Sequence, residues 1–80
     1  MTSVLFFGHL ADRLGRQIDV PLEGATTVAE LRRQLAERGE GFAELSDPRI
    51  RISVDQAIVG EDHPVPADAE VAFLPILSGG

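Results

Sequence analysis

Short runs in which apolar and polar residues alternate, or in which apolar β-favouring residues follow one another, are spread along the whole chain. Runs of this length are typical of strands and are too short for stable helices. Pro21 and Pro75 each end one of them, because proline cannot donate to a sheet ladder. The predicted strands are residues 4–7, 17–20, 50–55, 57–60 and 70–74.

One helix is predicted between the second and third of these strands. Thr27 and Glu30 match a capping box, in which a hydroxyl and a carboxylate satisfy free backbone N–H groups at a helix start. Gly39 stands where the glycine that follows a helix is expected. The apolar stripe of this helix consists of Val28, Leu31 and Leu35. The charged residues expected mostly on its other sides are Arg32, Arg33, Glu37 and Arg38.

The remaining segments are predicted to be connections. Residues 8–15 carry a brief helical or turn-like piece that Gly15 closes. Residues 40–49 are expected to form a loop, with Phe42 and Leu45 packed beneath it. Residues 61–68 contain two prolines and are also expected to be a loop.

The order strand, strand, helix, strand, short strand, strand predicts an α+β domain of two layers. A chain of 80 residues forms one small domain, in which one helix covers one face of one sheet. The first and last strands are the most apolar, so we expect them to be central neighbours. This is the plan of a ubiquitin-like β-grasp fold, a single mixed sheet of about five strands with one main helix packed on one face. We expect residues 1–75 to form this domain and residues 76–80 to form a flexible C-terminal tail.

Because the helix covers only one face, the other face of the sheet is left open. Neighbouring residues of a strand point to opposite faces, so one of Phe6 and Phe7, and one of Phe73 and Leu74, faces away from the helix. An apolar patch on an open face is more often an interface than an accident. This alternation alone leaves open which member of each pair faces out.

Missing residue types limit the chemistry available to the chain. Without cysteine there is no disulfide, thiolate metal site or cysteine nucleophile, so any sulfur has to be carried on another group. Without lysine, all seven basic side chains are arginine, and a Schiff base on a side chain is excluded. The spacing of His9 and His63 does not suggest a metal site, and no motif typical of a catalytic centre is present.

The net charge of −6 disfavours nucleic acids and anionic membranes as partners, because binding to phosphate needs clustered positive charge. The acidity either keeps a small protein in solution or forms a face that attracts basic partners. No apolar run is long enough for a membrane-spanning helix, and the N-terminus has no leader pattern. We therefore expect a cytoplasmic protein.

The sequence ends in Gly79 and Gly80. A terminal carboxylate becomes a good electrophile only when a nucleotide activates it, and to be activated it must be threaded through a narrow channel of a partner enzyme to the α-phosphate of ATP. Glycine has no Cβ, so its backbone can approach other groups closely and adopt dihedral angles closed to other residues. Two terminal glycines after an ordered strand and a proline therefore indicate a reactive tail, whereas the dipeptide alone is a weak signal.

Three blocks of sequence carry a family resemblance. They are the N-terminal Val4-Leu5-Phe6-Phe7-Gly8, the central Val54-Asp55-Gln56, and the C-terminal run from Asp68 to Gly80. With these blocks in order over its whole length, the chain resembles the small subunit of molybdopterin synthase. It departs from the usual family pattern at Asp55, Leu74, Ile76 and Ala11. The last of these replaces an arginine common in the family, so a partner salt bridge at that position is not carried over.

The resemblance implies a sulfur carrier rather than an enzyme in its own right. An E1-like enzyme would use ATP and Mg²⁺ to adenylate Gly80, which would then become a thiocarboxylate, while the chain itself binds no cofactor or metal. The tail, with Ser78 and Gly79 in the channel, would enter the large subunit and deliver sulfur to cyclic pyranopterin monophosphate in a heterotetramer of two small and two large subunits. The residues that the resemblance places at the partner interface are Phe7, Ile58, Leu74 and Pro75.

Three alternatives share the same fold and tail. The first is a sulfur carrier for the thiazole of thiamine. The length of the chain and its N-terminal Leu-Phe-Phe block favour a molybdopterin synthase subunit over this alternative. The second is a ubiquitin-like modifier that forms isopeptide bonds. The third is an interaction module with an inert tail.

Overall fold

A mixed five-stranded sheet, one long helix on one of its faces and a small second sheet make up the computed structural model, which describes residues 1–22 and 26–75. Among these residues, no helix is both long and apolar enough to cross a membrane. In chain order, the elements are β1 (Thr2–Phe6), α1 (His9–Leu14), β2 (Gln17–Val20), β3 (Thr26–Thr27), α2 (Val28–Ala36), the 3-10 helix η1 (Glu40–Ser46), β4 (Arg51–Val54), β5 (Ala57–Val59), β6 (Pro64–Val65) and β7 (Glu70–Leu74).

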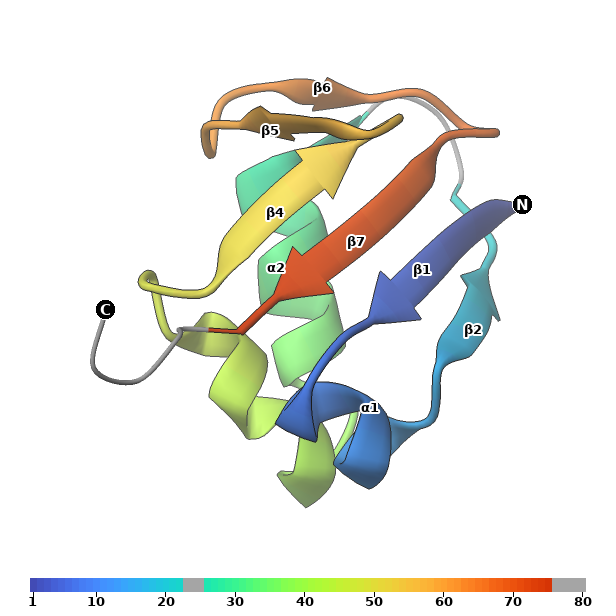
Figure 1. The fold of residues 1–80 in the computed structure, drawn as a ribbon. Coiled ribbons are helices and arrows are strands. Elements are labelled where there is room, and N and C mark those ends of the chain that lie inside the picture. Colours follow the sequence, from blue (N-terminus) through green and yellow to red (C-terminus); the bar gives the residue numbers. More distant parts are fainter. Residues whose placement is uncertain (23–25, 76–80) are drawn as a thin grey trace.

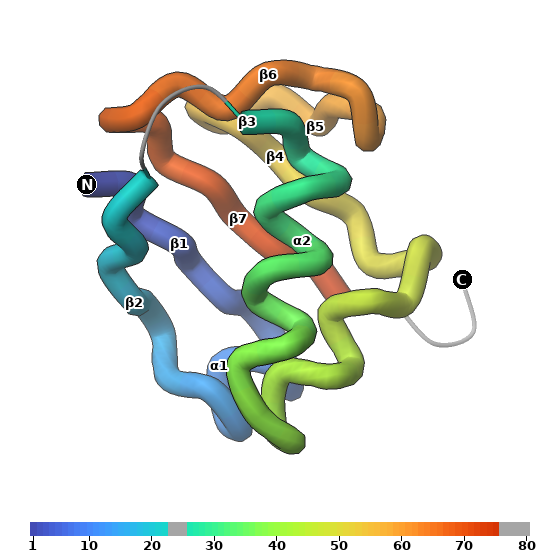
Figure 2. Tube along the Cα trace, turned by 180° about the vertical axis from the view of Figure 1, so that it is seen from behind, coloured from blue at the N-terminus to red at the C-terminus, as the bar shows by residue number. Residues whose placement is uncertain are grey.

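The first and last strands lie side by side at the centre of the main sheet, whose order is β2-β1-β7-β4-β5. β1 and β7 run parallel, and each of the other neighbouring pairs is antiparallel. Helix α2 crosses behind the sheet in Figure 1 and in front of it in Figure 2, so it covers one face only. The predicted α+β architecture and the central pairing are both confirmed.

The core lies between α2 and the covered face of the sheet. Alternate residues of the central strands point toward the helix, as the period of two requires. The ring of Phe6 stacks on that of Phe73, with their centroids 5.7 Å apart. Burying a side chain of this size stabilises the fold by about 1.5–3 kcal/mol. The buried residues that meet here include Val4, Phe6, Val28, Leu31, Leu35, Ile52, Val54, Val71 and Phe73.

The N-terminus of α2 forms half of the predicted capping box. The side-chain oxygen of Thr27 accepts a hydrogen bond from the backbone N–H of Glu30 at 3.2 Å. The carboxylate of Glu30 instead binds the side chains of Arg33 and Gln34. An exposed carboxylate thus finds a guanidinium partner one turn along the helix, which is a common arrangement at this spacing.

Two more N–H groups of α2 are satisfied by the segment that was predicted to be a loop. Val28 donates to the carbonyl of His63 and Ala29 to the carbonyl of Glu61, both at 2.9 Å. The same segment also contains β6, which pairs with β3. The prediction of plain loop over residues 61–68 was therefore wrong in part, because this segment serves the helix start, where four N–H groups lack partners within the helix.

Two predictions about the residues after α2 were wrong. The helix ends at Ala36, with Glu37 still in helical conformation, and Gly39 is extended and begins η1 rather than closing α2. Residues 40–46 form a 3-10 helix instead of a loop. Three residues make one turn of such a helix, so Phe42 and Leu45 lie on the same side and pack on the core, as expected for these two side chains.

Arg32 lies inside the protein rather than on an exposed side of α2, and only 6% of its surface is accessible. It donates to the carbonyls of Leu45, Asp47 and Ile50 at 2.8–2.9 Å, and to both carboxylate oxygens of Glu61 at 2.8 and 3.1 Å. All five donors of the guanidinium are thereby used. The residue joins α2 to the end of η1, to the start of β4 and to the segment before β6.

The turn between β4 and β5 has an uncommon backbone. Asp55 and Gln56 both adopt positive φ, at 50° and 73°, which is typical of glycine or asparagine in two-residue hairpins. Asp55 donates its N–H to the carbonyl of Glu70 at 2.8 Å, and its carboxylate accepts from the N–H of Glu70 at 3.0 Å. These bonds fix the hairpin against the start of β7.

Replacing Arg32 tests its role as the link between these segments. Arg32→Met leaves three backbone carbonyls without their donor, so we expect the free energy of unfolding to fall by about 2–3 kcal/mol in urea denaturation. Arg33→Met is the matched control, because Arg33 forms only exposed ion pairs, and we expect it to leave the free energy of unfolding nearly unchanged. Equal losses in the two variants would contradict the role given to Arg32.

Candidate functional site

The face of the sheet opposite α2, called the open face below, carries large apolar side chains that solvent reaches. Phe7 is 47% exposed and Ile58 is 58% exposed, whereas Phe6 and Phe73 are buried against α2. Leu74 is partly exposed at the end of β7. Phe7 and Leu74 are thus the outward members of the two pairs that sequence alternation left undecided.

Strand register aligns further residues with these three. Ile58 lies opposite Ser53, Ser53 opposite Ala72, and Ala72 opposite Leu5. Residues that face each other across strands share a face of the sheet. We call the apolar members of this arrangement the open-face patch, and they are Leu5, Phe7, Ile58, Ala72 and Leu74. Leu5 and Ala72 were missed in the sequence, although each stands two residues from a predicted member, which is the spacing for one face.

A depression of about 500 Å³ lies where β1 leads into α1. Its wall contains apolar residues of the open-face patch, the carboxylate of Asp12 and the guanidinium of Arg16. An apolar hollow with a few polar groups at its rim is the common form of a binding surface. The lining residues are Leu5, Phe6, Phe7, Gly8, Ala11, Asp12 and Arg16.

Pro75, the last described residue, packs against Gly8. Gly8 has φ of +59°, and a Cβ placed on it would come within 2.7 Å of Cγ of Pro75. The backbone there is also tied to β7, because Phe7 donates its N–H to the carbonyl of Phe73 at 3.3 Å. Gly8 thus sets the point from which the chain continues beyond β7. The predicted tail residues Ser78, Gly79 and Gly80 lie outside the described residues.

An ion-pair clasp links α1 to η1 beside this region. Nε2 of His9 lies 2.6 Å from Oε2 of Glu44, and Nη1 of Arg13 donates to Oε1 of Glu44 at 3.2 Å. The hydrogen bond from His9 is the largest effect that lowers the pKa of Glu44 below its ordinary value, and the charges of both partners add to it. The clasp holds α1, which forms one wall of the depression, against η1.

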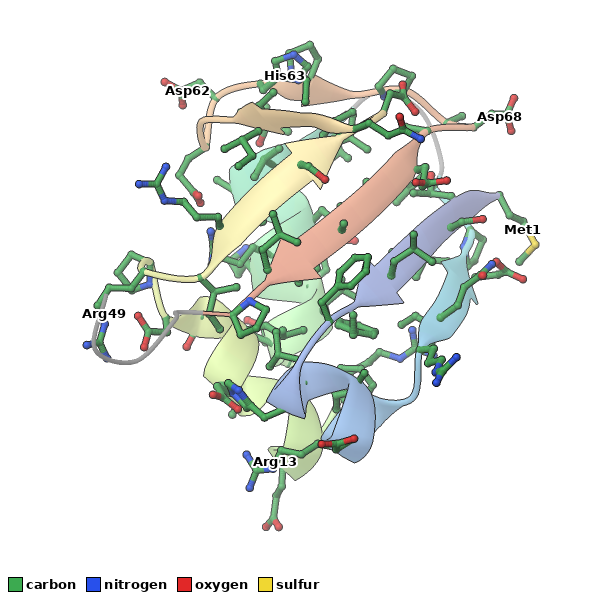
Figure 3. All side chains as sticks on the ribbon, in the orientation of Figure 1. Met1, Arg13, Arg49, Asp62, His63 and Asp68 are labelled. Atoms are coloured by element: carbon green, nitrogen blue, oxygen red, sulfur yellow. The ribbon has the colours of Figure 1, made fainter. Side chains whose placement is uncertain are left out.

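The two histidines lie in different places. His9 belongs to the clasp together with Arg13. Figure 3 shows His63 at the opposite end of the molecule from Arg13, directly before β6. Its Nδ1 contacts the carbonyl of Pro64 at 2.8 Å. Within residues 1–22 and 26–75, no three histidine or acidic side chains come close enough to hold a metal ion.

Changing Gly8 tests how the exit of the chain is fixed. Gly8→Ala places a methyl group against Pro75 in a backbone conformation that alanine rarely adopts. We expect a loss of about 1–2 kcal/mol in the free energy of unfolding, and shifted NMR signals of Pro75 and Leu74. Gly39→Ala is the control, since nothing lies within 4 Å of its added Cβ. Unchanged signals and stability in Gly8→Ala would refute this packing.

The clasp predicts a specific dependence on pH. Because the folded-state pKa of Glu44 is lowered, its contribution is complete above the ordinary glutamate pKa and is lost as the pH falls through the lowered value. We expect Glu44→Gln to lose about 0.5–1 kcal/mol at neutral pH and this deficit to shrink as the pH falls, in denaturant titrations at about pH 7 and about pH 3. Glu37→Gln, which removes an exposed partner of Arg33, is the control. A deficit of equal size at both pH values would contradict the titration of Glu44 as its cause.

Comparison with known proteins agrees with this architecture. The crystal structure of SAMP1 from Haloferax volcanii superposes with a TM-score of 0.77 over 99% of this chain and 98% of that chain, at 21% identity, which shows a shared ubiquitin-like β-grasp fold. The molybdopterin synthase sulfur carrier subunit of Escherichia coli is 33% identical over 81 residues, covering 100% of both sequences. The sequence model of the ThiS family matches residues 4–80, a stretch that includes every member of the open-face patch and both terminal glycines. The chain therefore belongs to the ThiS family of sulfur carriers.

Proposed function

We propose that this sulfur carrier is the small subunit of a molybdopterin synthase and that the carboxylate of Gly80 holds the sulfur. The full-length similarity to the Escherichia coli sulfur carrier subunit is the observation that carries the proposal. The family match extends to Gly80, so the two terminal glycines fall within the related region. The absence of cysteine leaves the C-terminal carboxyl group as the natural carrier of sulfur on this chain.

The proposed chemistry begins with activation of this carboxylate. Its oxygen attacks the α-phosphorus of ATP on an E1-like enzyme that uses Mg²⁺, which releases pyrophosphate and forms an acyl-adenylate. Sulfide then attacks the acyl carbon and displaces AMP, which leaves a thiocarboxylate on Gly80. Ser78 and Gly79 would pass through the narrow channels of both partners, because glycine lets other groups approach the backbone closely.

The second partner in this proposal is the large subunit of the synthase, in a heterotetramer of two small and two large subunits. The exposed Phe7 and Ile58, the adjoining Leu74, and Pro75 would form the contact surface. An exposed apolar patch of this kind is characteristic of protein interfaces. The large subunit would supply the catalytic groups, and the small subunit would contribute the sulfur without catalysing the reaction alone. The proposed place of this reaction is the cytoplasm.

The proposed product is the dithiolene of molybdopterin, formed by two successive sulfur transfers to cyclic pyranopterin monophosphate. Each transfer returns Gly80 to a carboxylate, which can be charged again. A carrier for the thiazole of thiamine would use the same charging steps and differ only in the acceptor. The 33% identity over the full length of a molybdopterin synthase subunit supports the pterin as acceptor.

Charging of the tail can be measured directly by intact-mass spectrometry. The full chain is incubated with an E1-like adenylating enzyme of the molybdopterin pathway, ATP, Mg²⁺ and sulfide. We expect a mass gain equal to the exchange of one oxygen for sulfur, complete loss of this gain when Gly80 is deleted, and an unchanged gain in Gly60→Ala. No gain under conditions that charge the Escherichia coli subunit would contradict the proposal, and higher-mass conjugates in cell extract would favour a protein modifier.

A further inference from the structure

Most arginines of this acidic chain are engaged within the fold. Among the described residues, four form ion pairs with carboxylates, and a fifth lies over an aromatic ring at 5.5 Å. These five are Arg13, Arg32, Arg33, Arg49 and, over Phe42, Arg38. The chain has seven arginines in all. The two that remain, Arg16 and Arg51, are exposed and take no part in an ion pair with any residue the structure describes.

Both of these arginines border the open-face patch. Arg16 lines the depression together with Leu5 and Phe7. Arg51 lies opposite Leu74 in the register of β4 and β7, so it shares the open face with that residue. Arg16 directly precedes β2, and Arg51 begins β4, which is three strands away from β2 in the sheet, so the two arginines lie on either side of the patch.

Several acidic side chains lie toward the other end of the central strands. Glu70 and Asp19 both lie opposite Ser3, near the start of β1 and β7. Figure 3 shows Asp62 and Asp68 at that end too, whereas Arg13 stands at the opposite end. Asp12, in the depression with Arg16, is the one acidic residue in its lining. Arg16, in the depression, and Arg51, opposite Leu74, thus lie toward the end of β7, although the chain as a whole has a net charge of −6.

We infer that the open-face patch docks on an acidic protein surface, whose apolar side chain enters the depression beside Phe7 and whose carboxylates pair with Arg16 and Arg51. The inference rests on the proposed function, since the partner in question is the one that receives the tail. Opposite charges around an apolar centre steer a partner and fix its orientation. A polyanion is disfavoured as occupant, because two separated guanidinium groups are too few to offset the net negative charge.

The test measures binding of the full chain to a molybdopterin synthase large subunit by titration calorimetry at low and high salt. We expect Arg16→Gln and Arg51→Gln each to weaken binding about 2- to 5-fold at low salt, and much less at about 1 M salt, where charges are screened. Asp12→Asn removes the one carboxylate in the depression and is expected to tighten binding, by up to about 3-fold. Gln34 is an exposed residue of α2. Gln34→Glu makes the same change in net charge as each arginine variant, and we expect it to leave the affinity unchanged.

Each outcome separates local charge pairing from other causes. Weakening by Arg16→Gln and Arg51→Gln that disappears at high salt supports the inference, as does the opposite sign for Asp12→Asn. Arginine variants that bind like the wild type, or a Gln34→Glu variant that weakens binding equally, would overturn it while leaving the proposed function intact. A wild-type chain that acquires sulfur but does not bind the large subunit would refute both the inference and the proposed synthase role.

Discussion

Four register pairs between β1 and β7, from Ser3 opposite Glu70 to Phe6 opposite Phe73, join segments from the two ends of the chain at the centre of the sheet. Because β1 and β7 run parallel, both strands finish at the same end of the sheet. Phe6 and Phe73 meet under α2, while Phe7 and Leu74 emerge on the open face at the same end of their strands. Because β7 ends beside Gly8, the chain leaves the domain next to the open-face patch. The fold thus brings the open-face patch and Pro75, the last described residue, to one place.

A second interaction holds the connections around this centre. Arg32 uses its five donors on three carbonyls and one carboxylate, and these belong to segments that no regular sheet ladder joins. Buried polar groups are costly unless they are paired, so this arrangement is stable because every donor has an acceptor. One of these bonds holds the carbonyl of Ile50, directly before β4, and the pairing of β4 with β7 sets Arg51 opposite Leu74. In a domain this small, one such side chain can replace part of an apolar core.

Periodicity was sufficient to predict the elements with the strongest local signal. The alternating strands, the stripe of Val28, Leu31 and Leu35, and the central position of the first and last strands are all confirmed. Features that depend on distant partners could not be predicted in this way. Arg32 carries the same local signal as the exposed Arg33, and only the carbonyls that surround it in the fold distinguish them. The positive φ of Gln56 is another such case, because the hairpin imposes it on a residue that does not favour it. The resemblance places Phe7, Ile58 and Leu74 at the expected interface, whereas Leu5, Ala72 and Arg51 were found from the strand register and Arg16 from the lining of the depression.

The proposed function finally depends on where the sulfur goes. The most direct measurement is a single-turnover reaction of the thiocarboxylated chain, the large subunit and cyclic pyranopterin monophosphate, in which both the remaining thiocarboxylate and the molybdopterin formed are quantified. A dithiolene contains two sulfurs, and each chain carries one. The proposed function predicts that two charged chains return to the carboxylate form for each molybdopterin produced. A thiocarboxylate that persists beside unreacted pterin, but is consumed in thiazole synthesis, would contradict it.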